Sequence, residues 1–202
     1  MGNHRTTDNA FENPNHQKVS KMKIGVYGTT GDANDEEINE KARELGREIA
    51  LRKHVLVTGG SFGIPYQSVL AAHENAGKTI AYSNSTNLAG HLKQKKAVQG
   101  FTEIIYIPSS YEHASNPLIC GKYRNVSCIA AVDKAIIIGG GIGTMNEFTI
   151  AYDLGKDIGI LEGTGGITTD AIETLLKATV KKTSSRIIRE TNPKTLLDKL
   201  LE

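Results

Sequence analysis

The fold of this 202-residue chain is decided by the stretch KAIIIGGGIGTMNE, residues 134–147. Its apolar run, Lys134–Ile138, predicts a strand that is buried on both faces. Glycines at 139–141 and 143 predict a tight turn, and a helix is expected from Thr144 to Leu154. A buried strand that enters a helix through a glycine-rich turn is typical of a parallel α/β sheet, whose ligands bind at the carboxyl ends of the strands.

The same alternation of strand and helix extends outward from this stretch in both directions. Apolar runs predict further strands at 23–27, 55–58, 79–82, 103–107, 157–161 and 186–188. Helical spacing and capping residues predict helices at 35–53, 65–75, 116–132, 169–178 and 192–201. Residues 83–100 fit a lid or a short helix. We predict a single α/β domain over residues 22–202, doubly wound with a mainly parallel sheet, after a flexible polar tail at 1–21.

Composition excludes several classes of protein. Hydrophobic residues make up 39% of the chain, and 24 Lys and Arg against 22 Asp and Glu leave a net charge of +2. This balance leads us to expect no nucleic-acid partner, and the absence of a long apolar run predicts no membrane span. Cys120 and Cys128 lie in apolar surroundings and are expected to be buried free thiols of a cytoplasmic protein. Scattered histidines and the lack of a C-x-x-C motif predict neither a metal site nor a cofactor.

Two further glycine-rich loops follow predicted strands: GTTG at 28–31 and GGSFG at 59–63. The second matches the G-x-S-x-G motif of serine hydrolases, but no Asp lies between Ser61 and His113 and no His follows His113. It is better interpreted as a turn that lets backbone approach a ligand. The loop at 139–144 lacks the third glycine of a dinucleotide fingerprint, because Asn146 stands there.

Four glycines in five residues exceed what one turn needs, so the sequence favours a bound ligand at the loop after Ile138. Its backbone N–H groups and the positive end of the following helix together favour an anion. Phosphate is the natural occupant.

The run Gly140-Gly141-Ile142-Gly143-Thr144-Met145-Asn146-Glu147 resembles the G-G-x-G-T-x-x-E signature of the lysine-decarboxylase-like Rossmann proteins. Thr58-Gly59-Gly60 and Tyr123-Arg124-Asn125 extend the likeness. This superfamily includes the Lonely Guy enzymes, nucleotide phosphoribohydrolases, the molybdenum-cofactor carrier protein and uncharacterised nucleotide-binding proteins. The resemblance implies a Rossmann-like fold, a nucleoside 5′-monophosphate ligand and a homo-oligomer, a dimer or larger.

The resemblance also implies which residues form the site. Arg124 and Glu147 would be the catalytic pair. The residues expected to bind phosphate or the rest of the nucleotide are Gly28, Thr29, Gly59, Gly60, Ser61, Asn125, Gly140, Gly141, Gly143 and Thr144. Three positions depart from the enzymatic pattern: Gly139 replaces a proline, Asn125 a lysine and Asn146 a frequent acidic residue. These departures are closer to the uncharacterised nucleotide-binding branch.

The residues themselves leave two alternatives open for Arg124. Its helical neighbours Cys120, Gly121, Ser127 and Cys128 are small, so its guanidinium either points at an anion or reaches solvent at the edge of the core.

Glu147 stands three residues after Thr144, the spacing of a capping box at a helix start. That position predicts a lowered pKa of Glu147 and an electrostatic role rather than that of a general acid.

Two functions follow as hypotheses. One is hydrolysis of the N-glycosidic bond of a nucleoside 5′-monophosphate, and the other is a non-catalytic carrier of a nucleotide or cofactor.

Overall fold

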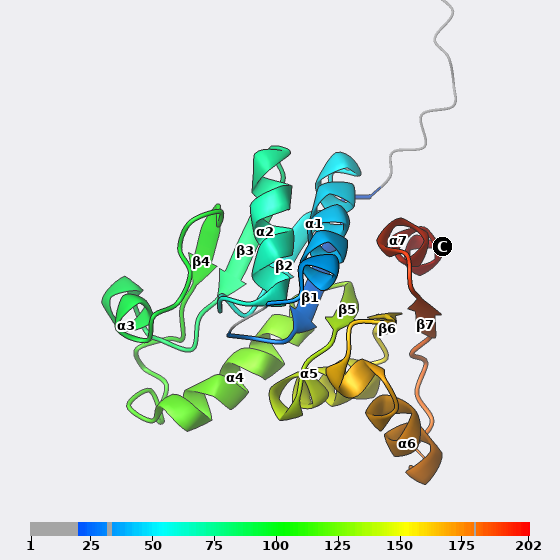
Figure 1. The fold of residues 1–202 in the computed structure, drawn as a ribbon. Coiled ribbons are helices and arrows are strands. Elements are labelled where there is room, and N and C mark those ends of the chain that lie inside the picture. Colours follow the sequence, from blue (N-terminus) through cyan, green and yellow to red (C-terminus); the bar gives the residue numbers. More distant parts are fainter. Residues whose placement is uncertain (1–19, 32–33, 180) are drawn as a thin grey trace, which may run out of the picture.

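A computed structural model describes residues 20–31, 34–179 and 181–202, which form a single α/β domain (Figure 1). The strands are β1 (Lys23–Gly28), β2 (Val55–Thr58), β3 (Lys78–Tyr82), β4 (Glu103–Ile105), β5 (Lys134–Ile138), β6 (Asp157–Leu161) and β7 (Ile187–Glu190). The α-helices are α1 (Glu36–Leu51), α2 (Ile64–Glu74), α3 (Leu88–Lys93), α4 (Pro117–Ala130), α5 (Ile142–Asp153), α6 (Ala171–Ala178) and α7 (Pro193–Leu201).

The strands form one parallel sheet in the order β4-β3-β2-β1-β5-β6-β7. The sheet is doubly wound, because the chain moves outward from β1 through β2 to β4 and then returns to β5 on the other side. β1 therefore pairs with β5, with Ile24 opposite Lys134 and Gly28 opposite Ile138. The predicted fold class is confirmed, and the reversal of strand order between β1 and β5 is where ligands bind in such folds.

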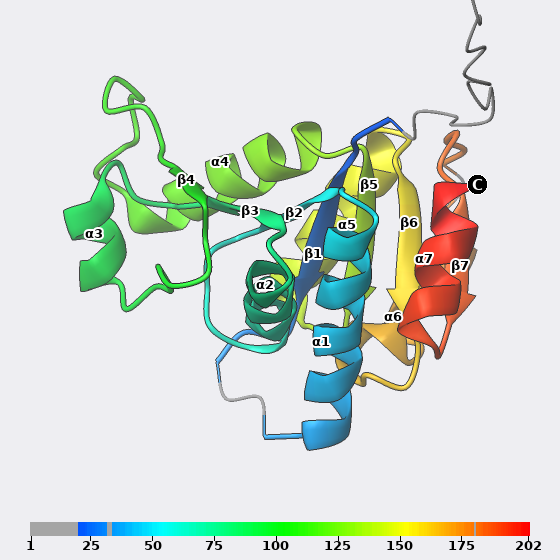
Figure 2. The same cartoon turned by 90° about the horizontal axis from the view of Figure 1, so that it is seen from above.

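Helices cover both faces of the sheet. α1, α2 and α7 lie on one face, and α4, α5 and α6 lie on the other (Figures 1 and 2). Each layer has its own apolar cluster, with Leu45 and Leu196 in the first and Ile129 and Phe148 in the second. Burial of these side chains on both faces explains why the central strands are apolar throughout.

α1 and α2 cross closely, and the sequence allows this at Gly46. A Cβ atom at Gly46 would lie 2.0 Å from the backbone oxygen of Ser68 in α2. Asp35 caps α1 by accepting a hydrogen bond from the N–H of Ile38, as its position before the apolar stripe predicts. The close crossing of α1 and α2 therefore depends on the absence of a side chain at Gly46.

Asp157, the first residue of β6, joins the amino ends of three neighbouring strand segments. Its carboxylate accepts hydrogen bonds from Lys134 Nζ at 2.8 Å and from Arg186 Nη2 at 2.8 Å. These cationic partners, with Arg186 the stronger, hold the pKa of Asp157 well below its ordinary value. One carboxylate thus connects β5, β6 and the segment that enters β7.

Two predictions about secondary structure need correction or completion. α5 begins at Ile142, two residues earlier than expected, so Gly143 and Thr144 are helical. Within the stretch 83–100 a short helix forms, α3, capped by the side chain of Asn87. The predicted tail at 1–21 lies, except for residues 20 and 21, outside the described residues.

Cys120 and Cys128 are buried and unlinked, as expected. No helix in the described ranges is long and apolar enough to cross a membrane.

Candidate functional site

A cavity of about 380 Å³ opens at the carboxyl ends of β1, β2 and β5, where the strand order reverses. Its volume is within the range of small-molecule sites. It is lined by Val26, Tyr27, Gly28, Thr29, Thr30, Thr58, Gly59, Ser61, Pro65, Lys96, Arg124, Asn125, Gly141, Gly143, Thr144 and Glu147. Ten of the predicted site residues line it: Gly28, Thr29, Gly59, Ser61, Arg124, Asn125, Gly141, Gly143, Thr144 and Glu147.

Gly60 and Gly140 were also expected to bind the ligand, but neither lines the cavity. The N–H of Gly60 donates to Thr58 Oγ1, and the N–H of Gly140 donates to Thr29 Oγ1 at 2.8 Å. Both glycines have positive φ, +70° and +92°. In the structure they shape the turns that carry their neighbours into the cavity.

The amino end of α5 faces the cavity without a side-chain cap. Its N-cap residue is Gly141, and the first helical hydrogen bond runs from Met145 N–H to Gly141 O. The N–H groups of the first turn have no partner within the helix, so they are available to an anion. Cβ atoms at Gly141 and Gly143 would meet nothing within 4 Å, which leaves the approach to this backbone open.

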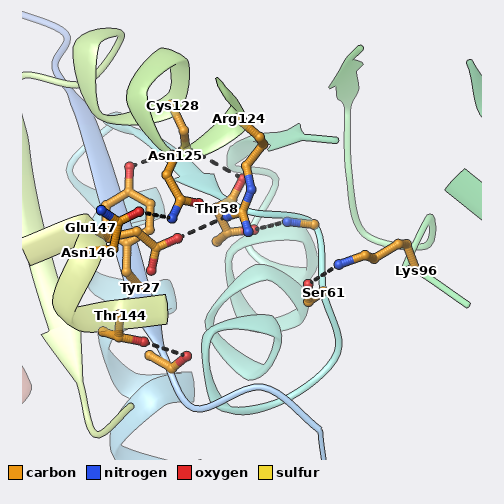
Figure 3. A network of polar contacts seen from close by, with 12 residues as sticks. Tyr27, Thr58, Ser61, Lys96, Arg124, Asn125, Cys128, Thr144, Asn146 and Glu147 are labelled. Atoms are coloured by element: carbon orange, nitrogen blue, oxygen red, sulfur yellow. Dashed lines mark hydrogen bonds and ion pairs between the residues drawn. The ribbon is translucent and has the colours of Figure 1, made fainter. Parts of the chain in front are cut away.

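Arg124 and Glu147 meet inside the cavity (Figure 3). Arg124 Nη1 donates to Glu147 Oε1 at 2.9 Å, and the two side chains are 16% and 9% exposed. A Cβ atom at Gly59 would lie 2.0 Å from Arg124 Nη1, so the guanidinium passes directly over this glycine. Of the two alternatives for Arg124, the structure shows the anion, and this anion is a carboxylate of the protein itself.

The capping box predicted for Thr144 and Glu147 is wrong. Because α5 starts at Ile142, Glu147 lies in its second turn rather than at the third position, and its carboxylate turns inward to Arg124. Thr144 Oγ1 donates to the backbone oxygen of Gly28 at 3.2 Å. Burial raises the pKa of Glu147 above its ordinary value, against the lowering effect of Arg124, so the lowered pKa expected from a first-turn position is also wrong.

Asn125 and Arg124 leave polar atoms without partners at the cavity. Asn125 Nδ2 donates to Asn146 Oδ1 at 2.9 Å, while Asn125 Oδ1 and Arg124 Nε are buried and form no hydrogen bond within the described residues. A buried polar atom without a hydrogen-bond partner lowers stability.

Tyr27 lines the cavity, and its hydroxyl contacts the buried Cys128. The Tyr27 hydroxyl lies 3.3 Å from Cys128 Sγ, and burial is the main reason why the pKa of Cys128 rises to about 12. This thiol is therefore protonated and unreactive at neutral pH.

Lys96 is a site residue that sequence reasoning missed. Its Nζ donates to Ser61 Oγ at 2.6 Å at the mouth of the cavity. Burial and the charge of Arg124 lower the pKa of Lys96. Nothing in the local pattern of residues 83–100 marks Lys96, because its contact with Ser61 spans 35 positions of the chain.

A parallel sheet with helices on both faces and a cavity where its strand order reverses defines a Rossmann-like protein. Residues 21–197 match the SLOG cluster4 family, and the chain belongs to that family.

Similar proteins include one of unassigned role and several of known structure. An uncharacterised protein of Archaeoglobus fulgidus is 33% identical over 141 residues, which cover 70% of this chain and 80% of the relative. The X-ray structure of TM1055 is similar with a TM-score of 0.72 at 21% identity, covering 89% of this chain and 98% of TM1055. The molybdenum cofactor binding protein from Rippkaea orientalis has a TM-score of 0.68 at 21% identity, covering 90% and 96%.

A third similar structure corrects the expectation that nucleic acid is excluded as a partner. DNA processing protein A from Helicobacter pylori, described with a single-stranded DNA binding mode, has a TM-score of 0.60 at 21% identity, covering 89% of this chain and 80% of that one. Net charge is a sum over the whole surface, whereas phosphate contacts depend on local cations. A net charge of +2 was therefore a wrong ground for excluding nucleic acid.

Proposed function

We propose that the cavity binds a nucleoside 5′-monophosphate and that the protein hydrolyses the bond between its base and its ribose. The observation that carries this proposal is the buried Arg124–Glu147 pair, which shares a cavity of mononucleotide size with an uncapped helix end. A binding site alone would not need a carboxylate inside a site that favours anions.

The phosphate would lie against the first turn of α5. Gly141 and Gly143 keep this backbone accessible, and the N–H groups together with the helix dipole favour a dianion. The ribose would then extend along α5 toward Glu147, which lies one turn further along the same helix.

Glu147 would act on the charge that develops at the sugar. Cleavage of an N-glycosidic bond passes through an oxocarbenium-like state, which a fixed carboxylate stabilises. Water adds to C1′, the base leaves with the bonding electron pair, and the proton lost by the water ends on the base. The raised pKa of Glu147 makes the carboxylate a better acceptor for that proton in transit.

Arg124 would orient Glu147 and keep it ionised, because its guanidinium opposes the effect of burial on the Glu147 pKa. Asn125, which also lines the cavity, would lie beside the ribose or the base and help to position it. These two neighbours on α4 thus have separate tasks in binding and in orientation.

A second candidate is a carrier that binds a phosphate-bearing cofactor without turnover. It is favoured by the fold shared with the molybdenum cofactor binding protein of Rippkaea orientalis and with the Moco carrier protein of Chlamydomonas, at a TM-score of 0.61. A carrier needs the cavity and the helix end, but it does not need the charge of Glu147.

The test is to incubate the protein with the 5′-monophosphates of adenosine, guanosine, cytidine and uridine, and to measure free base by chromatography. Base release by the parent protein and its loss by 10²-fold or more in Glu147→Gln would support hydrolysis. Calorimetric binding without base release from any nucleotide would refute hydrolysis and favour the carrier. Neither binding nor release would refute the proposal that the cavity binds a nucleoside 5′-monophosphate. Thermal melting of Glu147→Gln is the control, because the variant keeps the shape of the side chain.

A further inference from the structure

Lys96 reaches the cavity from the segment between α3 and β4. Figure 3 shows its side chain pointing to Ser61, which lies in the loop between β2 and α2. The 2.6 Å contact joins Lys96 Nζ to Ser61 Oγ, and both residues line the cavity. A hydroxyl is a neutral partner, so this contact does not balance the charge of the ammonium group.

The charged side chains of the cavity are two cations and one carboxylate, so one positive charge remains unbalanced although Glu147 attracts both Lys96 and Arg124. Lys96, Arg124 and Glu147 line the cavity, and the Glu147 carboxylate is bonded to Arg124. Within residues 20–31, 34–179 and 181–202, no carboxylate lies within 4.0 Å of Lys96 Nζ. A half-buried ammonium group has three donors, and here one of them meets a hydroxyl.

The backbone before Lys96 ends helix α3. Lys95 has φ of +53° as the left-handed residue of a helix C-terminus, where the N–H of Lys95 donates to Leu92 O and the N–H of Lys96 donates to His91 O. The N–H of Ala97 donates to the backbone oxygen of Gly60, which fixes the segment against the loop of Ser61. His91 is fully buried, and its two ring nitrogens lie 2.9 Å from Ser83 Oγ and 2.9 Å from the backbone oxygen of Ala97.

Lys93, in the same basic stretch, is exposed and does not line this cavity, whereas Lys96 is partly buried and does.

Lys96 and the amino end of α5 belong to different parts of the sheet. Ser61 follows β2, whereas Gly141 follows β5, and β1 lies between these two strands. In Figure 3 the Lys96–Ser61 contact lies on one side of the Arg124–Glu147 pair and Thr144 lies on the other. A phosphate on α5 would thus lie beyond the end of β5, whereas the Lys96 ammonium group contacts the loop after β2.

We propose that Lys96 and Ser61 form a second anion subsite, so that the ligand of this cavity carries an anionic group in addition to its 5′-phosphate. This inference rests on the proposed function, because it assumes that the first phosphate lies on α5. Lys96 supplies the charge and two hydrogen-bond donors, and the Ser61 hydroxyl fixes the ammonium group and can add a donor of its own.

Two ligand classes share this chemistry. A nucleoside 5′-diphosphate carries the second anion next to the first, and a nucleoside 3′,5′-bisphosphate carries it across the ribose. Separate arms of the test distinguish these sources.

The test compares the 5′-monophosphates of the four common nucleosides with their 5′-diphosphates and 3′,5′-bisphosphates by calorimetry. We expect one of the two doubly anionic classes to bind at least about tenfold more tightly than the matching monophosphate. In Lys96→Met this preference, measured as the ratio of the two dissociation constants in the same variant, should fall to less than about twofold. Ser61→Ala, which keeps the charge, should lose part of the preference.

Lys93→Met is the matched control, since it removes one positive charge from an exposed position near Lys96. It should retain the preference in full. If Lys96→Met melts at a lower temperature than the parent protein, Lys96→Gln repeats the measurement with a side chain that can still bond Ser61.

Monophosphate binding without a preference for a second anion would overturn this inference and leave the proposed function intact. A preference that survives in Lys96→Met would overturn it as well. If none of these nucleotides binds, the proposed function itself fails, so the two failures are distinguishable.

Discussion

At the scale of single residues, neighbouring glycines of one loop have opposite requirements. Gly140 has φ of +92°, and a Cβ atom there would lie 2.4 Å from Thr144 Cβ. Gly143 is helical, and its Cβ would meet nothing within 4 Å. The first glycine is needed for folding, while the second is needed only if a ligand approaches the backbone.

Gly143→Ala should therefore separate stability from binding. Alanine favours the helix, so the free energy of unfolding should rise by up to about 1 kcal/mol, while nucleotide affinity falls because the methyl group points toward the amino end of α5. Gly140→Ala is the matched comparison and should lose about 1–3 kcal/mol of stability. Urea unfolding and calorimetry measure both quantities, and unchanged affinity in Gly143→Ala would contradict a phosphate at this helix end.

Contacts between single side chains are also the feature that the sequence predicted least well. The spacing of Thr144 and Glu147 matches a capping box, yet the helix incorporates Gly143 and begins before both residues. The partner of Glu147 is Arg124, 23 positions away on another helix, and no local pattern encodes that contact. Lys96 escaped notice for the same reason, whereas the glycine loops were recognised because their conformation is local.

At the scale of elements, the close crossing of α1 and α2 reverses the usual effect of a glycine substitution. Gly46→Ala should destabilise the protein by about 1–3 kcal/mol, because the new methyl group would meet the Ser68 carbonyl. Gly121→Ala in α4 is the control, since a Cβ there meets nothing within 4 Å and should add about 0.5–1 kcal/mol. Thermal melts compare the two variants. Equal changes in melting temperature would show that α1 and α2 can move apart without a loss of stability.

The Asp157 contacts that join β5, β6 and the start of β7 should show in acid. The pKa of Asp157 is lowered in the folded state, so its contribution to stability is present above the unfolded value near 3.8 and is lost as pH falls toward the folded value. Asp157→Asn should lower the free energy of unfolding by about 1–2 kcal/mol at neutral pH. In urea unfolding, the difference in free energy of unfolding between variant and parent should become smaller below about pH 4. A difference that stays constant with pH would assign the effect to packing.

Elements with a strong pattern were predicted well. The apolar runs place β2, β5 and β6 at the observed residues, because a buried central strand has a simple sequence signature. The stretch 83–100 was ambiguous, since its shape depends on His91 bridging Ser83 and Ala97 rather than on periodicity. α5 was placed two residues late, because glycine is a poor helix former on its own and only the surrounding fold makes it helical.

At the scale of the whole molecule, ligand binding should stabilise one region of the sheet. Hydrogen exchange with a nucleoside 5′-monophosphate at 100 times its dissociation constant should slow at the first turn of α5 and in the loop 59–63, by at most the linkage limit of about 2.7 kcal/mol. Exchange within β7 and α7, which lie at the far edge of the sheet, should stay unchanged unless the amides exchange by global unfolding. Protection centred on α6 or α7 would place the ligand elsewhere.

The pairing of β1 with β5 also governs how the chain is made. As the polypeptide leaves the ribosome, β2, β3 and β4 can add one after another to β1, but the other edge of β1 has no partner until residues 134–138 emerge. Until then a nascent chain of more than half the final length carries an open, apolar strand edge, which is a site for mispairing between chains. The cavity is incomplete before α5 is synthesised, because Gly143, Thr144 and Glu147 line it. A molecule that binds only the complete cavity therefore cannot stabilise the chain during the early half of its synthesis.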